Sequence, residues 1–107
     1  MPTKEELYDE ADKLKDQGQL DEAVAKLHEV LAMDGRYALA HSALAVLYTK
    51  LKQHDLAIQH GQTVCQLEPD DPFSYTAMSV TFQRAGFIPE AEDAMARARM
   101  LQGGHMH

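Results

Sequence analysis

Residues 44–67, LAVLYTKLKQHDLAIQHGQTVCQL, contain two apolar stripes separated by a short polar break at 53–55. In the first stripe Leu44, Leu47 and Leu51 recur at steps of three and four residues, and a second stripe runs from 57 to 67. Apolar residues at this spacing indicate helices that bury one face. The stretch therefore predicts a helical hairpin. We expect the hairpin to end before Pro69, because proline cannot continue a helix.

The same pattern occurs three times along the chain, at a spacing of 34 residues. The segments LDEAVAKL, DLAIQHG and PEAEDAM place Ala23, Ala57 and Ala91 in one register. Small residues at such positions let two helices approach closely, so each segment predicts the second helix of a hairpin. Four further columns share this register: Gly18/Lys52/Gly86, Leu14/Tyr48/Phe82, Ala11/Ala45/Ser79 and Val30/Val64/Ala98.

The helix boundaries follow from residues that favour helix ends. Thr3 with Glu6 predicts a capping box at the first helix, and Pro89 suits the first turn of the last helix. Gly18 and Gly86 lie where a helix ends in left-handed backbone. We expect helices near 4–17, 21–33, 38–51, 55–67, 72–85 and 89–101.

This period and these columns resemble the tetratricopeptide repeat family. The resemblance covers about residues 4–105. It implies an all-α fold: a right-handed superhelical stack of three antiparallel helical hairpins, or α-solenoid. We expect a single domain over 1–107, with repeats at about 4–37, 38–71 and 72–105. The sequence departs from the family at the large aromatic near each repeat start, where Leu7, His41 and Tyr75 stand, and at the closing proline, replaced by Gly35 and Gly103.

The first and last repeats carry polar residues where the middle repeat is apolar. Glu92 and Arg99 stand in the columns of Ile58 and Cys65, and Glu10 stands in the column of Leu44. End repeats of a solenoid need such polar faces, so we expect a complete small protein. The last repeat lacks a further capping helix, and two such ends could form a homodimer by an isologous contact.

In the family, the first helices of successive repeats line a concave groove, where the resemblance implies a bound partner. An apolar floor is expected at Ala43, Val46, Ala77 and Val80, which solvated helix faces do not normally carry. The alternative is that some of these residues pack against the neighbouring helix. The full predicted groove comprises Tyr8, Asp9, Asp12, Asp16, Leu39, Ser42, Ala43, Val46, Thr49, Lys50, Phe73, Thr76, Ala77, Val80, Gln83 and Arg84.

Charge constrains the partner. The chain has 17 acidic and 10 basic side chains and a net charge of -7, which argues against nucleic acid and anionic membranes. Repeat one holds ten acids and five bases, repeat two four and two, and repeat three three of each. We therefore expect a protein or peptide segment with an apolar stretch and a basic end. Some family members hold acidic chaperone tails with a clamp of lysine, asparagine and arginine. That clamp is absent here, because none of the residues at its positions is basic or an amide: Tyr8, Asp12, Ala43, Phe73 and Ala77.

Other chemistry receives little support from the sequence. The chain has no glycine-rich phosphate loop and no nucleophile elbow, and no base stands next to Cys65 in the sequence, so we expect neither an enzyme nor a cofactor. We expect Cys65 to be a buried structural thiol and His41 to be packed rather than bound to a metal. The tail at 103–107, GGHMH, could hold copper or nickel loosely, or it could be inert. The single cysteine and the polar, acidic N-terminal segment favour a cytoplasmic protein.

The sequence thus predicts a protein–protein interaction module that binds an extended or helical segment in its groove. The rival hypothesis is a structural self-assembly unit that oligomerises through its exposed C-terminal repeat.

Overall fold

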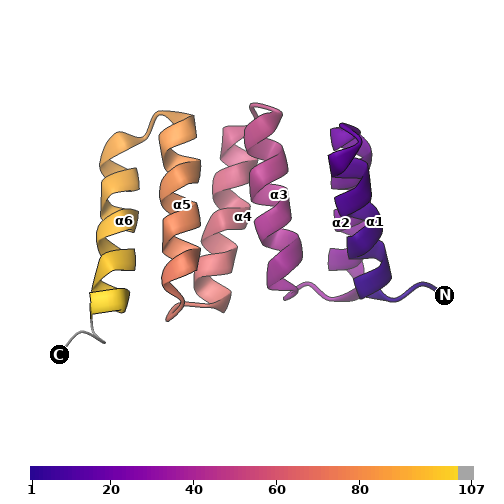
Figure 1. Ribbon diagram of the computed structural model, residues 1–107, viewed down its shortest axis with the longest axis horizontal. Coiled ribbons are helices and arrows are strands. Elements are labelled where there is room, and N and C mark those ends of the chain that lie inside the picture. Colours follow the sequence, from indigo (N-terminus) through magenta and orange to yellow (C-terminus); the bar gives the residue numbers. More distant parts are fainter. Residues whose placement is uncertain (104–107) are drawn as a thin grey trace.

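The computed structural model describes residues 1–103, which form six α-helices and no β-strand. Consecutive helices are paired as antiparallel hairpins that follow one another along the long axis of the molecule (Figure 1). The all-α prediction and the three hairpins are therefore confirmed. The helices are α1 (Lys4–Asp16), α2 (Leu20–Met33), α3 (Ala38–Lys50), α4 (His54–Leu67), α5 (Pro72–Ala85) and α6 (Ile88–Gly103).

Each predicted helix boundary lies within two residues of the observed one. The capping box at α1 is present: the Thr3 hydroxyl accepts from the Glu6 N–H at 3.1 Å, and the Glu6 carboxylate accepts from the Thr3 N–H at 3.0 Å. Pro89 lies in the first turn of α6, where its missing N–H costs no intrahelical bond. These ends could be predicted because each depends on residues a few positions apart.

The turns inside the three hairpins share one backbone conformation. Gly18 has φ 79° and Gly86 has φ 88°, both in the left-handed region that glycine adopts easily. Lys52 occupies the equivalent position with φ 64°, although it carries a side chain. A non-glycine residue in this conformation costs about 1–2 kcal/mol. The middle repeat therefore keeps a lysine at a position where its backbone is strained.

The small columns lie at the contacts within each hairpin. Ala23 and Ala57 are fully buried, and Ala91 is 1% exposed. The Ser79 hydroxyl, also buried, donates a 2.8 Å hydrogen bond to the backbone oxygen of Ala91 and so links α5 to α6. Larger side chains at these positions would force the paired helices apart.

Replacing Ala57 with leucine is expected to destabilise the protein by about 1–3 kcal/mol, because three extra carbons must enter a closely packed contact. A Gln59→Leu variant adds an apolar side chain to the exposed face of the same helix and is the matched control. Thermal melts of both variants should show a clear decrease only for Ala57→Leu. Equal melting temperatures for the parent and Ala57→Leu would show that the column is loosely packed.

The polar replacements in the end repeats face solvent. Glu10, Glu92 and Arg99 are exposed, whereas Leu44 of the middle repeat is buried. The apolar columns therefore form a core centred on α1 to α4, with smaller side chains completing it at α5 and α6.

Within residues 1–103, none of the helices combines the length and apolar character needed to cross a lipid bilayer.

Candidate functional site

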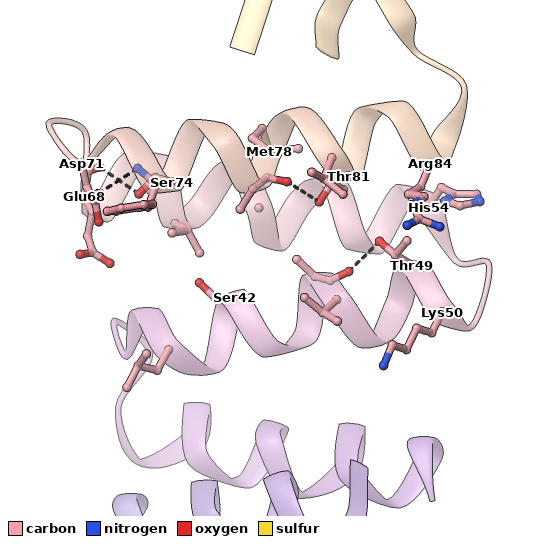
Figure 2. A pocket seen from close by; sticks show the side chains of 18 of the residues that line it. Ser42, Thr49, Lys50, His54, Glu68, Asp71, Ser74, Met78, Thr81 and Arg84 are labelled. Atoms are coloured by element: carbon pink, nitrogen blue, oxygen red, sulfur yellow. Dashed lines mark hydrogen bonds between the residues drawn. The ribbon is translucent and has the colours of Figure 1, made fainter. Parts of the chain in front are cut away.

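A cavity of about 810 Å³ opens between α3 and α5, with α4 behind it (Figure 2). Its apolar surface includes Val46 and Val80, whose exposed fractions are 51% and 44%. Leu39 and Phe73, at 55% and 72%, lie toward the beginnings of the same two helices. The predicted groove residues that line the cavity are Leu39, Ser42, Val46, Thr49, Lys50, Phe73, Ala77, Val80 and Arg84.

The acidic residues of α1 do not line this cavity. Asp9 is exposed, and the Lys15 ammonium lies 3.0 Å from Asp12 and 3.9 Å from Asp16. Tyr8 packs edge-on against Tyr37, with ring centroids 6.0 Å apart, and burial is the main cause of its raised pKa. These four predicted groove residues are thus engaged on the first hairpin or point to solvent.

Three further predicted groove residues also lie outside the cavity lining. Ala43 is half-buried and packs against the core, as the alternative interpretation allowed. The Thr76 hydroxyl donates to the backbone oxygen of Pro72 at 3.1 Å, and Gln83 is exposed. On α3 the alanine that lines the cavity is Ala45 rather than Ala43.

Gly61 is a cavity residue that the sequence analysis did not single out. A Cβ atom at this position would lie 2.8 Å from the sulfur of Met78, so the glycine leaves room for the end of the Met78 side chain. A glycine inside a helical pattern costs about 1 kcal/mol relative to alanine, and such a cost often has a packing reason. A glycine inside a helical pattern was thus the only feature of the sequence that could have indicated this contact.

Charged groups divide the cavity into two ends, as Figure 2 shows. Lys50, Arg84 and His54 lie at one end, at the last turns of α3 and α5 and the first turn of α4. Glu68 and Asp71 lie at the other end, around the loop between α4 and α5. The apolar residues stand between them, so the cavity suits a segment with an apolar middle and charged ends.

A histidine cluster lies behind α3, where the first hairpin meets the second. The His41 Nε2–H donates to the backbone oxygen of Gly35 at 2.9 Å, so its Nδ1 accepts from the His60 Nδ1–H at 3.0 Å. The His28 Nε2 lies 2.9 Å from the Tyr48 hydroxyl, and the His28 and His60 rings are 6.1 Å apart. The prediction that His41 is packed is confirmed by its 8% exposure.

The cluster strongly disfavours a proton on His60. Desolvation, followed by the neighbouring His41 and His28, lowers the His60 pKa from 6.5 to about 4. No group of three metal-ligating side chains with suitable geometry occurs in the part of the chain that the structure describes. Residues 104–107 of the possible metal-binding tail at 103–107 lie outside the described part of the chain.

Cys65 is half-buried rather than fully buried, and its thiol lies 3.5 Å from the backbone oxygen of Ser74. Burial raises the pKa of the Cys65 thiol. A raised pKa keeps the thiol protonated and unreactive.

Comparison with known proteins gives one family match and many structural matches. The family model described as tetratricopeptide repeat matches residues 8–72, which is more than half of the chain. No curated protein matches the sequence.

Solved structures with the same fold share little sequence with this chain. A MamA structure has a TM-score of 0.87 and 20% identity, covering 95% of this chain and 60% of that chain. The Yersinia enterocolitica type III secretion translocator chaperone SycD has a TM-score of 0.84 and 20% identity, covering 95% of this chain and 77% of that one. The second TPR of Spaghetti (RPAP3), solved with the HSP90 peptide SRMEEVD, has a TM-score of 0.82 and 17% identity, covering 92% of both chains. The chain thus spans about 60% of the length of the MamA structure.

Proposed function

The chain belongs to the tetratricopeptide repeat family, and we propose that it is a protein–protein interaction module that binds an extended or helical partner segment in its groove. The observation that carries the proposal is the cavity between α3 and α5, whose walls expose Val46 and Val80. Helix faces that point to solvent rarely present such a patch without a partner to cover it. The RPAP3 domain, which shares the fold, was solved with a bound peptide.

The proposed partner is a protein or peptide segment with an apolar stretch and a basic end. The apolar stretch would cover the cavity walls, and the basic end would meet acidic side chains, since the chain has a net charge of -7. The same charge disfavours nucleic acid and anionic membranes as partners. Tetratricopeptide repeat domains typically do not catalyse reactions, and we propose neither an enzyme activity nor a cofactor for this one.

The domain organisation predicted from the sequence is also a proposal. The three repeats, at about 4–37, 38–71 and 72–105, would form one domain. A cytoplasmic location remains a proposal that rests on the single cysteine, Cys65, in the sequence.

The second candidate is self-assembly through the last repeat. Its support is the exposed apolar surface at the C-terminal hairpin, where Phe87, Ile88 and Met100 are 44%, 49% and 70% exposed. Isologous contact between two such surfaces would form a homodimer.

Two measurements test the proposed function against this rival. Light scattering over a wide concentration range should report a monomer if the cavity receives a partner, and a dimer if the last repeat is the binding surface. Affinity purification followed by mass spectrometry should be run with the parent and with a variant that carries Val46→Asp and Val80→Asp. A partner that binds the parent and not this variant would support the groove, whereas equal capture by both proteins would contradict it.

A further inference from the structure

The cavity between α3 and α5 carries positive groups at one end that lack ion-pair partners among residues 1–103. Every ion pair in residues 1–103 lies within 4–34, on the first hairpin and the loop after it. Lys50, Lys52 and Arg84 all line the cavity, and none of them has a carboxylate within salt-bridge distance in that part of the chain. Their charges are therefore free to meet an anionic group that enters the cavity.

Two further observations concern the same end of the cavity. The Nδ1 atom of His54 is buried and has no hydrogen-bond partner among the described residues. A buried polar atom without a partner costs free energy, which a bound hydrogen-bonding group would recover. Lys52 adopts φ 64°, although the equivalent positions in the other repeats are glycines. Strain of this kind persists more often at functional sites than elsewhere.

The opposite end of the cavity is acidic. Glu68 is exposed, and Asp71 accepts a hydrogen bond from the Phe73 N–H at 2.9 Å. Figure 2 shows Glu68 and Asp71 at the beginning of α5 and Arg84 near its end, on opposite sides of the apolar wall. A cation on a ligand would be attracted to this acidic end and repelled from the end at Arg84.

We propose that the occupant of this cavity is an extended peptide segment with an apolar middle, a carboxylate at the Lys50–Arg84 end and a cation at the Glu68–Asp71 end. The proposal rests on the proposed function and deepens it, because it fixes the direction in which the segment lies. The carboxylate is either a chain terminus or an acidic side chain. Both offer two oxygens to the same donors, which prefer charge-assisted hydrogen bonds.

The test is a selection from displayed libraries of short random peptides, one with free C-termini and one with amidated C-termini. Each library is selected against the parent and against the Val46→Asp, Val80→Asp variant. We expect enriched peptides that carry a cation before the apolar stretch and a carboxylate after it. Enrichment in the free-terminus library alone would identify the terminus as the source of the carboxylate, and enrichment in both libraries would identify acidic side chains.

Affinities of the selected peptides then test the assignment of the two ends. A variant with Lys50→Glu and Arg84→Glu should bind at least about tenfold more weakly, as the loss of a charged hydrogen bond implies. The matched control carries Arg36→Glu and Arg99→Glu, which change the net charge equally at residues outside the cavity. A peptide in which the cation and the carboxylate exchange places should lose at least as much affinity for the parent.

The outcomes separate the two proposals. Peptides that are enriched on the parent but not on the valine variant, and that show no charge preference, would contradict the proposed direction and still support the groove. The same conclusion would follow if such peptides bound the Lys50, Arg84 variant as tightly as the parent. If no enrichment depends on the two valines, the proposed function fails, and this inference fails with it. A lower melting temperature of the Lys50, Arg84 variant with unchanged affinity would mean that both residues only stabilise helix ends, and it would also overturn the inference.

Discussion

A variant with Val46→Asp and Val80→Asp is expected to lose binding to the partner segment by at least about 3 kcal/mol, a hundredfold or more in affinity. The two valines line the same cavity, Val46 from α3 and Val80 from α5. An apolar side chain of the partner that covers these positions must displace the water around them. In the variant this water hydrates two carboxylates, and removing it from an unpaired carboxylate costs much free energy. Isothermal titration calorimetry with a captured partner or a selected peptide measures the loss.

Folding of this variant should change little. Both valines are about half exposed, so aspartate at these positions remains hydrated in the free protein. Valine and aspartate have similar helix propensities, so the exchange should cost no more than about 0.5 kcal/mol at each exposed site. Circular dichroism melts should therefore stay close to those of the parent. A variant that unfolds would show that the two valines belong to the core and that the groove is misplaced.

The control for this experiment carries the same added charge elsewhere. Met33→Asp with Met100→Asp changes two exposed apolar residues on α2 and α6, which do not line the cavity. This control should bind with the affinity of the parent. Loss of self-association in the control, together with unchanged self-association in the valine variant, would instead support assembly through the last repeat.

The stability of the protein is expected to fall by about 2 kcal/mol between pH 7 and pH 5, because of His60. The His60 pKa is lowered from 6.5 in the unfolded chain to about 4 in the folded protein. Between these two pH values the His60 ring is protonated in the unfolded chain but neutral in the folded protein. The contribution of His60 to the free energy of unfolding is therefore complete above pH 6.5 and is lost progressively as the pH falls toward 4. Urea denaturation at a series of pH values gives the free energy of unfolding directly.

The groups that surround His60 explain why it stays neutral. His41 and Tyr48 face it from α3, and His28 faces it from α2. None of them is a carboxylate that could stabilise a protonated ring. Glu6 and Asp34 are carboxyl groups with a lowered pKa, and their contribution to stability is lost only as the pH falls below their ordinary pKa values of 4.5 and 3.8. The change in stability between pH 7 and pH 5 therefore reports mainly on His60.

A His60→Gln variant separates this effect from the rest of the titration. Glutamine can still donate to the Nδ1 atom of His41 but does not titrate, so its stability should be nearly flat between pH 7 and pH 5. His54→Gln alters a histidine outside the cluster and should keep the pH dependence of the parent. If His60→Gln shows the same decrease as the parent, another group causes the loss of stability, and the cluster does not oppose protonation.

The sequence alone determined the parts of this protein that depend on local pattern and on period. The helices and their ends follow from apolar spacing, the Thr3–Glu6 capping box, Pro89 and the turn glycines, all of which act over a few residues. The family follows from the period of 34 residues and its small columns. For the same reason, nine of the predicted groove residues do line the cavity: a groove built from equivalent faces of successive helices repeats with the sequence.

Only the tertiary structure decided the features that depend on contacts between hairpins. Gly61 matters because Met78 approaches it from another helix, and His41 meets His60 although their counterparts in the first repeat are Leu7 and Lys26. The sequence could not show that the cations at the ends of α3 and α5 have no ion-pair partner among residues 1–103. Such contacts join residues that the repeat pattern does not relate, because helix packing angles and side-chain lengths, rather than sequence period, determine which side chains meet.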